Sequence, residues 1–211
     1  MIYAVLRVFF TVYLRLFHSL KITGAECIPD VGSVILCANH SSYFDSMLIG
    51  LCTRRQVHFL VYDTFYRHWF LGPFIQACGA IPVTENGINK EAMKKALTVL
   101  RNGGVIGIFP EGRLTQTGFL STGNPGAAML AALSRAPIVP ITIMGAFFVY
   151  PKGKKFPGHD KIMVKVNPPV TVDPVRRREK GYLQSVINEV MGCIGRSLLP
   201  ALHPNHDDTL T

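Results

Sequence analysis

The sequence predicts a single α/β domain in which helices flank a mixed, mostly parallel β-sheet. Two apolar runs that contain β-branched residues, 34–38 and 105–109, have the length and composition of buried strands. A short polar turn follows each run, and helix-compatible segments separate them, as in parallel sheets. A chain of 211 residues with 48% hydrophobic content can bury one sizeable core. We therefore expect one domain, residues 21–199, preceded by a helix (1–20) and followed by a flexible tail (200–211).

Residues 2–20 are strongly apolar and predict a helix with one narrow polar stripe. The stripe holds four residues at spacings of four, four and three: Arg7, Thr11, Arg15 and His18. Nineteen helical residues cover about 28 Å, nearly enough to span a bilayer, but two arginines inside the span would be costly at mid-depth. We expect an amphipathic helix that lies in the membrane interface with its basic stripe among head groups. The alternative is a helix packed on the core of the domain.

The other elements are predicted from apolar runs, turns and caps. Strands are expected at 21–24, 34–38, 57–62, 105–109, 138–144 and 161–166. Pro140 cannot donate to a ladder, so it is expected at an edge or a bulge, and the alternation at 161–166 predicts an antiparallel edge strand. Helices are expected at 46–52, at 65–79 with an aromatic core face, at 90–101 with Asn89 as N-cap, at 125–135 and at 176–198.

Residues 38–45 put a histidine and a carboxylate at the corner between a strand and a helix. Two residues five apart on a regular helix are rotated by about 140° and do not meet, so His40 must precede the helix. With Ser41 or Ser42 as N-cap, Asp45 lies in the first helical turn, where a carboxylate is favoured and can fold back toward the imidazole. The corner therefore predicts a general base with an orienting acid.

The chain repeats the same spacing elsewhere, at His58 and Asp63. That copy lies in a strand-like segment, where an odd separation points the two side chains to opposite faces. We expect no pair there. The spacing thus carries meaning only at the strand-to-helix corner.

A second polar turn, Phe109-Pro110-Glu111-Gly112-Arg113, follows the strand at 105–109. In α/β sheets, ligands bind in the crevice beyond the carboxyl ends of the strands. If the strands before the two turns are parallel, both turns open on the same side of the sheet. We therefore expect His40 and this second turn to share one site.

Four blocks of the sequence together resemble the glycerolipid acyltransferase family, the lysophosphatidic acid acyltransferases and their relatives. The blocks are Asn39-His40 with Asp45, Gly79-Ala80-Ile81-Pro82-Val83, residues 109–113, and Ile138-Val139-Pro140-Ile141. They agree with the family in order and spacing, and the likeness runs from about Gly24 to Pro169. The resemblance implies transfer of a fatty acyl group from a thioester to the free hydroxyl of a lysophospholipid, with 1-acylglycerol-3-phosphate converted to phosphatidic acid.

The resemblance also implies the roles of individual residues. His40 would remove the proton of the hydroxyl and Asp45 would orient it, Glu111 would bind the glycerol portion of the acceptor, and Arg113 its phosphate. Asn39, Gly112 and Pro140 lie in the matching blocks and are expected to help bind the substrate. No cofactor is implied, since acyl-CoA or acyl-ACP serves as co-substrate. Two departures concern the phosphate: the family's basic residue after the Gly-x-Ile-Pro-Val block is replaced by Thr84-Glu85-Asn86, and its later arginine by Leu114.

The net charge of +9 indicates an anionic partner. We expect an anionic membrane surface, with the protein on its cytoplasmic face and acyl carrier protein as a further partner, and no nucleic acid, because no nucleic-acid motif is present. The five cysteines form no Cys-x-x-Cys pair, which suits a reducing compartment, and no metal site is expected. Three alternatives stay open: an acyltransferase for another lysophospholipid acceptor, a noncatalytic protein that binds anionic lipid, and a serine hydrolase that uses Ser41 or Ser42.

Overall fold

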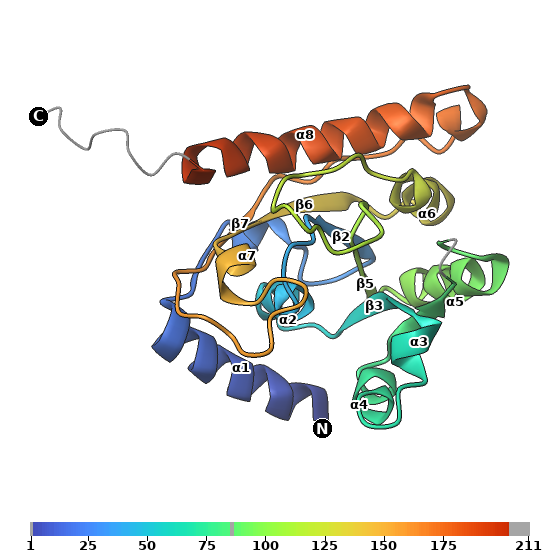
Figure 1. The fold of residues 1–211 in the computed structure, drawn as a ribbon. Coiled ribbons are helices and arrows are strands. Elements are labelled where there is room, and N and C mark those ends of the chain that lie inside the picture. Colours follow the sequence, from blue (N-terminus) through green and yellow to red (C-terminus); the bar gives the residue numbers. More distant parts are fainter. Residues whose placement is uncertain (1, 85–86, 203–211) are drawn as a thin grey trace, which may run out of the picture.

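The computed structural model describes residues 2–84 and 87–202, and these form helices on both faces of a seven-stranded sheet (Figure 1). The strand order is β1-β7-β6-β2-β5-β3-β4. The strands are β1 (Lys21–Thr23), β2 (Val34–Ala38), β3 (Val57–Tyr62), β4 (Ile81–Val83), β5 (Val105–Ile108), β6 (Ile138–Met144) and β7 (Met163–Val166). All neighbours pair in parallel except β6 and β7. The predicted α/β fold with a mostly parallel sheet is confirmed.

The helices divide between the two faces of the sheet. One face carries α1 (Ile2–His18), α2 (Asp45–Leu51) and α7 (Ala146–Val149), and the other carries α5 (Lys90–Arg101), α6 (Gly126–Ser134) and α8 (Tyr182–Leu202). Two short helices, α3 (Asp63–Tyr66) and α4 (Gly72–Ala77), follow β3, and 3-10 turns lie at Ala25–Cys27 and Arg176–Arg178. Strand β2 is buried along its whole length, because helices cover both of its faces.

Three expectations about the strands and helices were wrong. Pro140 lies inside β6, an interior strand between β2 and β7. A proline is tolerated there because the ladder between β6 and β7 begins only at the next residue, Ile141. Strand β7 is antiparallel to β6 as expected, but β1 covers its outer side, so β7 is not an edge strand. Residues 65–79 form no continuous helix with a core face. Their aromatic side chains are largely exposed, on α3, α4 and the turn between them.

The C-terminal end of the chain also differs in part from the expectation. Helix α8 begins at Tyr182, after a 3-10 turn, and continues to Leu202, so residues 200–202 of the expected tail are helical. Residues 203–211, which hold the remainder of that tail, lie outside the described residues. Among residues 2–84 and 87–202, no helix has both the length and the apolar character needed to cross a membrane.

The polar stripe of α1 does not face outward as one surface. His18 is buried against the domain, where its Nδ1 donates to the carbonyl of Asp160 at 3.2 Å, while Arg15 is exposed. Six large apolar side chains of α1 are exposed: Val5, Val8, Phe9, Val12, Leu16 and Phe17. At about 100° per residue, all of these except Phe17 fall within a wedge of about 100° around the helix. Helix α1 therefore packs on the domain through one face and presents an apolar face outward.

Candidate active site

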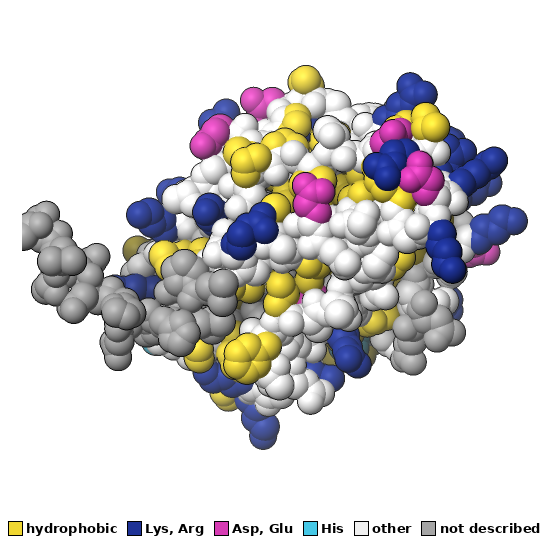
Figure 2. Space-filling model, turned by 90° about the horizontal axis from the view of Figure 1, so that it is seen from above, with side chains coloured by type: hydrophobic (Ala, Val, Ile, Leu, Met, Phe, Trp, Pro, Cys, Tyr) yellow, Lys and Arg dark blue, Asp and Glu magenta, His cyan; other side chains and the backbone are white. Residues whose placement is uncertain are grey.

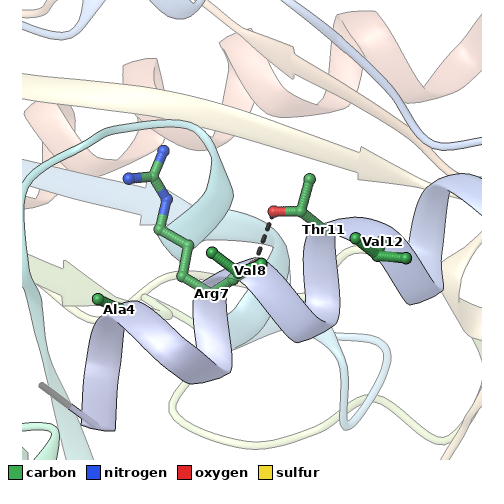
Figure 3. Close-up of a pocket in the computed structure, with 5 residues that line it drawn as sticks. All are labelled: Ala4, Arg7, Val8, Thr11 and Val12. Atoms are coloured by element: carbon green, nitrogen blue, oxygen red, sulfur yellow. Dashed lines mark hydrogen bonds between the residues drawn. The ribbon is translucent and has the colours of Figure 1, made fainter.

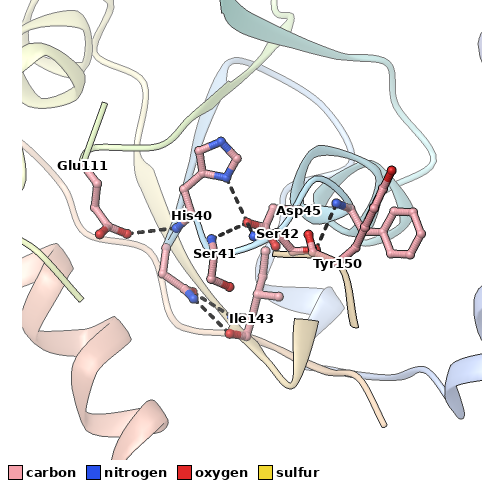
Figure 4. Close-up of polar contacts among 9 residues, drawn as sticks. His40, Ser41, Ser42, Asp45, Glu111, Ile143 and Tyr150 are labelled. Atoms are coloured by element: carbon pink, nitrogen blue, oxygen red, sulfur yellow. Dashed lines mark hydrogen bonds and ion pairs between the residues drawn. The ribbon is translucent and has the colours of Figure 1, made fainter. Parts of the chain in front are cut away.

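The corner after β2 brings the predicted histidine and carboxylate together. Nδ1–H of His40 donates to Oδ2 of Asp45 at 2.9 Å, with Asp45 at the first position of α2 (Figure 4). The Asp45 side chain is fully buried, whereas 23% of the His40 side chain is exposed. Because Nδ1 holds the proton shared with the carboxylate, the neutral ring presents Nε2 as its free proton acceptor. The second copy of the spacing forms no such pair: His58 Nδ1 instead bonds to the carbonyl of Gly79.

Asp45 is held in place by backbone groups. Its Oδ2 also accepts the N–H groups of Ser41 at 2.6 Å and Ser42 at 2.7 Å, while Oδ1 is buried and accepts no hydrogen bond within the described part of the chain. Burial raises the pKa of the Asp45 carboxyl, and the hydrogen bonds from His40 and from the two backbone N–H groups act to lower it. The three donors at one oxygen fix the carboxylate in the orientation that faces the imidazole.

The two serines do not cap α2 as expected. The helix begins after Phe44, which has no side-chain cap, because Asp45 itself draws the N–H groups of residues 41 and 42 to its carboxylate. The hydroxyl of Ser42 accepts from the N–H of Phe44 at 3.2 Å and donates to the carbonyl of Tyr150 at 3.0 Å. Both serines are buried. Their structural surroundings are those of turn residues.

The second polar turn meets the corner at the same edge of the sheet. Cys37 of β2 pairs with Ile108 of β5 in parallel, and His40 and Glu111 each follow three residues later. Accordingly, Oε1 of Glu111 accepts the backbone N–H of His40 at 2.9 Å (Figure 4). Its Oε2 accepts the hydroxyl of Ser121 at 2.7 Å and the N–H of that residue at 3.0 Å. Glu111 is buried and links the corner, the turn and the loop before α6.

An aromatic ring covers one face of the His40 imidazole. The ring of Phe109 stacks on it with centroids 3.9 Å apart and an angle of 12° between the planes. Phe59 of β3 continues the stack at 6.2 Å from Phe109, and Gly107 leaves the space that the Phe59 ring occupies. The stack restricts rotation of the imidazole about its side-chain bonds. Sequence reasoning missed this contact, although Phe109 and His40 stand near the ends of paired strands.

The remaining predicted site residues differ in their surroundings. Asn39 is buried, and its amide bridges the backbone of Ile143, accepting at 2.8 Å and donating at 2.9 Å. Pro140 is buried in β6, where it is the partner of Cys37 in β2. The part of Asn39 and Pro140 in substrate binding stays a prediction. Gly112 has a φ of +71°, which favours glycine, and Tyr62 donates a hydrogen bond to its carbonyl. Arg113 is exposed, and its guanidinium forms no ion pair with another described residue.

Fold and site together define a class of α/β protein in which a buried carboxylate holds a proton-accepting imidazole at the carboxyl edge of a parallel sheet. A family model described as Acyltransferase matches residues 19–144, which is more than half of the chain and includes His40, Asp45 and Glu111. The chain belongs to the acyltransferase family. The family resemblance and the enzyme class expected from the four sequence blocks are confirmed.

Similar proteins of this family are found in several bacteria. The chain is 29% identical over 136 residues to the 1-acyl-sn-glycerol-3-phosphate acyltransferase of Bacillus subtilis, covering 64% of this chain and 67% of that protein. It is 27% identical over 170 residues to the protein of the same name from Borreliella burgdorferi, covering 80% and 68%. The crystal structure of the 1-acyl-sn-glycerophosphate acyltransferase PlsC from Thermotoga maritima superimposes with a TM-score of 0.74 at 24% identity, covering 92% and 76%, which supports the fold.

Proposed function

We propose that this protein transfers a fatty acyl group from an acyl thioester to the free hydroxyl of a lysophospholipid, with 1-acylglycerol-3-phosphate as acceptor and phosphatidic acid as product. The observation that carries the proposal is the His40 imidazole, fixed by buried Asp45 through Nδ1 and left with Nε2 as a free acceptor. The two bacterial relatives described above bear the name of this activity, which supports the choice of acceptor.

The proposed reaction needs one proton acceptor and one oriented hydroxyl. Nε2 of His40 takes the proton of the acceptor hydroxyl, and the hydroxyl oxygen attacks the carbonyl carbon of the thioester. Asp45 stabilises the imidazolium that forms, as the acid does in a triad, but without a serine nucleophile. When the carbon–sulfur bond breaks, the thiolate leaves with the proton from the imidazolium. The products are an ester and a free thiol, and the enzyme returns to its starting state.

The second turn supplies the binding groups for the acceptor. Arg113 is exposed and holds the phosphate, since a guanidinium binds phosphate oxygens in pairs. Glu111 already accepts three protein hydrogen bonds, and a carboxylate offers about four acceptor positions, so it holds the corner in place and has room for one glycerol hydroxyl. The thioester is acyl-CoA or acyl-ACP, which act as co-substrates, and the reaction as written needs no cofactor.

A membrane surface is the proposed partner of α1. Its outward face carries Val5, Val8, Phe9, Val12 and Leu16, and Arg15 borders them on one side. An apolar helix face bordered by a cation lies favourably at the interface of an anionic bilayer. The five free cysteines fit the reducing cytoplasmic side.

The serine hydrolase alternative has weaker support from the site. Ser41 and Ser42 are buried, and the hydroxyl of Ser42 is engaged by the backbone of residues 44 and 150. A serine-reactive phosphonate is therefore expected to leave both residues unlabelled. The noncatalytic alternative predicts that His40 is expendable, which the following experiment addresses.

The test is release of free thiol from an acyl thioester in the presence of lysophosphatidic acid. We expect His40→Ala to abolish release while its thermal unfolding stays cooperative. His58→Ala is the matched control, because His58 repeats the spacing and bonds to a backbone carbonyl away from the corner. We expect that control to retain activity. Normal thiol release by the His40 variant would remove the proposed mechanism.

A further inference from the structure

Residues 65–74, which we call the aromatic elbow, expose a concentration of large apolar side chains. Trp69 is 84% exposed, and four further members of the elbow are also exposed: Phe65, Phe70, Leu71 and Phe74. The rings contact one another, with centroids of Trp69 and Phe70 at 5.6 Å and of Phe70 and Phe74 at 6.0 Å, yet they stay exposed. Each exposed ring costs hydrophobic free energy in water. The elbow therefore has the composition of a contact surface.

The elbow lies beside α1. Helix α4, which ends the elbow, contacts α1, and both lie along the lower edge of the molecule in Figure 1. The exposed apolar side chains of α1 include Val5, Val8, Phe9 and Val12. The two elements that carry exposed apolar side chains are therefore neighbours.

The charges around this surface are almost all positive. Helix α1 contains no acidic residue, and in 63–78 the one carboxylate, Asp63, forms an ion pair with Arg67 at 2.7 Å. Arg7 extends from α1 beside Val8, and its guanidinium lies at a groove lined by α1 (Figure 3). The hydroxyl of Thr11 donates a hydrogen bond to the backbone carbonyl of Arg7. Cations beside exposed aromatic rings complement an anionic lipid surface, and Trp favours the level of the head groups.

The opposite side of the molecule differs in character. On the side that carries α8, Lys and Arg predominate, a smaller number of Asp and Glu lie among them, and hydrophobic groups are scattered over the visible surface (Figure 2). Arg176 and Glu179 pair there at 3.0 Å. Basic side chains are therefore present on both sides, and the concentration of exposed aromatic rings on α1 and the elbow is what favours one orientation.

We propose that the aromatic elbow inserts into the interface of an anionic bilayer as a second contact beside α1, with Trp69 at the level of the head groups. The inference rests on the proposed membrane association of α1 and adds a second element to it. The elbow also adjoins the candidate active site along the chain. It follows Tyr62, whose hydroxyl donates to the carbonyl of Gly112 in the second polar turn, which binds the acceptor in the proposed reaction. Insertion of the elbow holds that turn close to the surface from which a lysophospholipid enters.

The experiment uses the fluorescence of Trp69, the single tryptophan of the full chain. Vesicles of phosphatidylcholine with phosphatidylglycerol are added, and binding is measured in parallel by sedimentation. We expect the emission to shift to shorter wavelength on binding, and lipids brominated on their acyl chains to quench it. Phe70→Ser should weaken vesicle binding by about tenfold, because one large apolar side chain no longer inserts. Val175→Ser, at an exposed apolar residue near α8, is the control and should bind as the wild type does.

The outcomes separate the elbow from α1. If the protein sediments with the vesicles but the emission of Trp69 neither shifts nor is quenched by the brominated lipids, the elbow proposal is overturned and α1 is left as the contact. Absence of sedimentation with these vesicles would overturn the elbow proposal together with membrane association. Thiol release tests acyl transfer separately from both.

Discussion

Replacement of Asp45 by Asn tests how much the buried charge contributes to the function of His40. The asparagine oxygen can occupy the place of Oδ2 and keep its three donors, at 2.6, 2.7 and 2.9 Å, so the imidazole stays oriented. What is lost is the negative charge that stabilises the imidazolium in the transition state. In a His–Asp pair of this kind the loss costs about 10²–10⁴-fold in kcat, or roughly 3–5 kcal/mol.

The expected effect on stability is smaller than the effect on activity. The new NH₂ group takes the position of Oδ1, which is buried and has no partner among the described residues, and an unsatisfied buried donor costs about 1–3 kcal/mol. Burial raises the pKa of Asp45, so at pH values above the pKa of the unfolded chain the ionised carboxylate destabilises the folded state. Asn carries no charge and removes this destabilisation. The two effects oppose each other.

The assay is thiol release at saturating acceptor, alongside thermal unfolding. Asp173→Asn, at an exposed carboxylate before Arg176–Arg178, serves as the control and should match the wild type in both. If the Asp45 variant unfolds cooperatively and keeps kcat within threefold of the wild type, the carboxylate does not assist the imidazole and the reasoning fails.

Three further predictions concern the acceptor turn and α1. Arg113→Ala should raise KM for lysophosphatidic acid and leave kcat nearly unchanged, with a phosphate-free monoacylglycerol as the control acceptor; an unchanged KM would place the phosphate elsewhere. Ser121→Ala removes the 2.7 Å hydrogen bond to Glu111 and should destabilise the fold by about 1 kcal/mol and lower kcat, measured by denaturant unfolding and thiol release; equal stability would mean the bond contributes nothing. Desolvation lowers the pKa of His18 below that of the unfolded chain, so its stabilising contribution is present above pH 6.5 and lost as pH falls. The free energy of unfolding of His18→Asn should therefore depend less on pH between 5 and 7.5 than that of the wild type. An equal dependence would exclude His18 as a source of the pH dependence.

Local signals in the sequence were sufficient for much of the fold. Helix α5 begins as expected because the side chain of Asn89 accepts the N–H of Ala92 at 2.8 Å, a contact within four residues of chain. The corner at His40 and Asp45 was predictable for the same reason. Its geometry depends on the six residues from His40 to Asp45 and on the start of a helix.

Contacts between distant segments were not predictable from such signals. The bonds of Glu111 depend on the register of Cys37 with Ile108 and on Ser121, a loop residue in a stretch without local pattern. The place of β7 depends on β1, which lies some 140 residues earlier in the chain. The aromatic residues of 65–74 were assigned to the core because hydrophobicity usually indicates burial, and that inference fails here because these side chains are exposed.

The central claim is that one imidazole and one polar turn act on the same lipid acceptor. The most direct measurement is mass spectrometry of the lipids formed from lysophosphatidic acid and an acyl thioester, with free thiol counted in the same sample. We predict one molecule of phosphatidic acid for each thiol released by the wild type, and neither product from His40→Ala. Thiol without the diacyl lipid, or equal amounts of diacyl lipid from both proteins, would contradict the account.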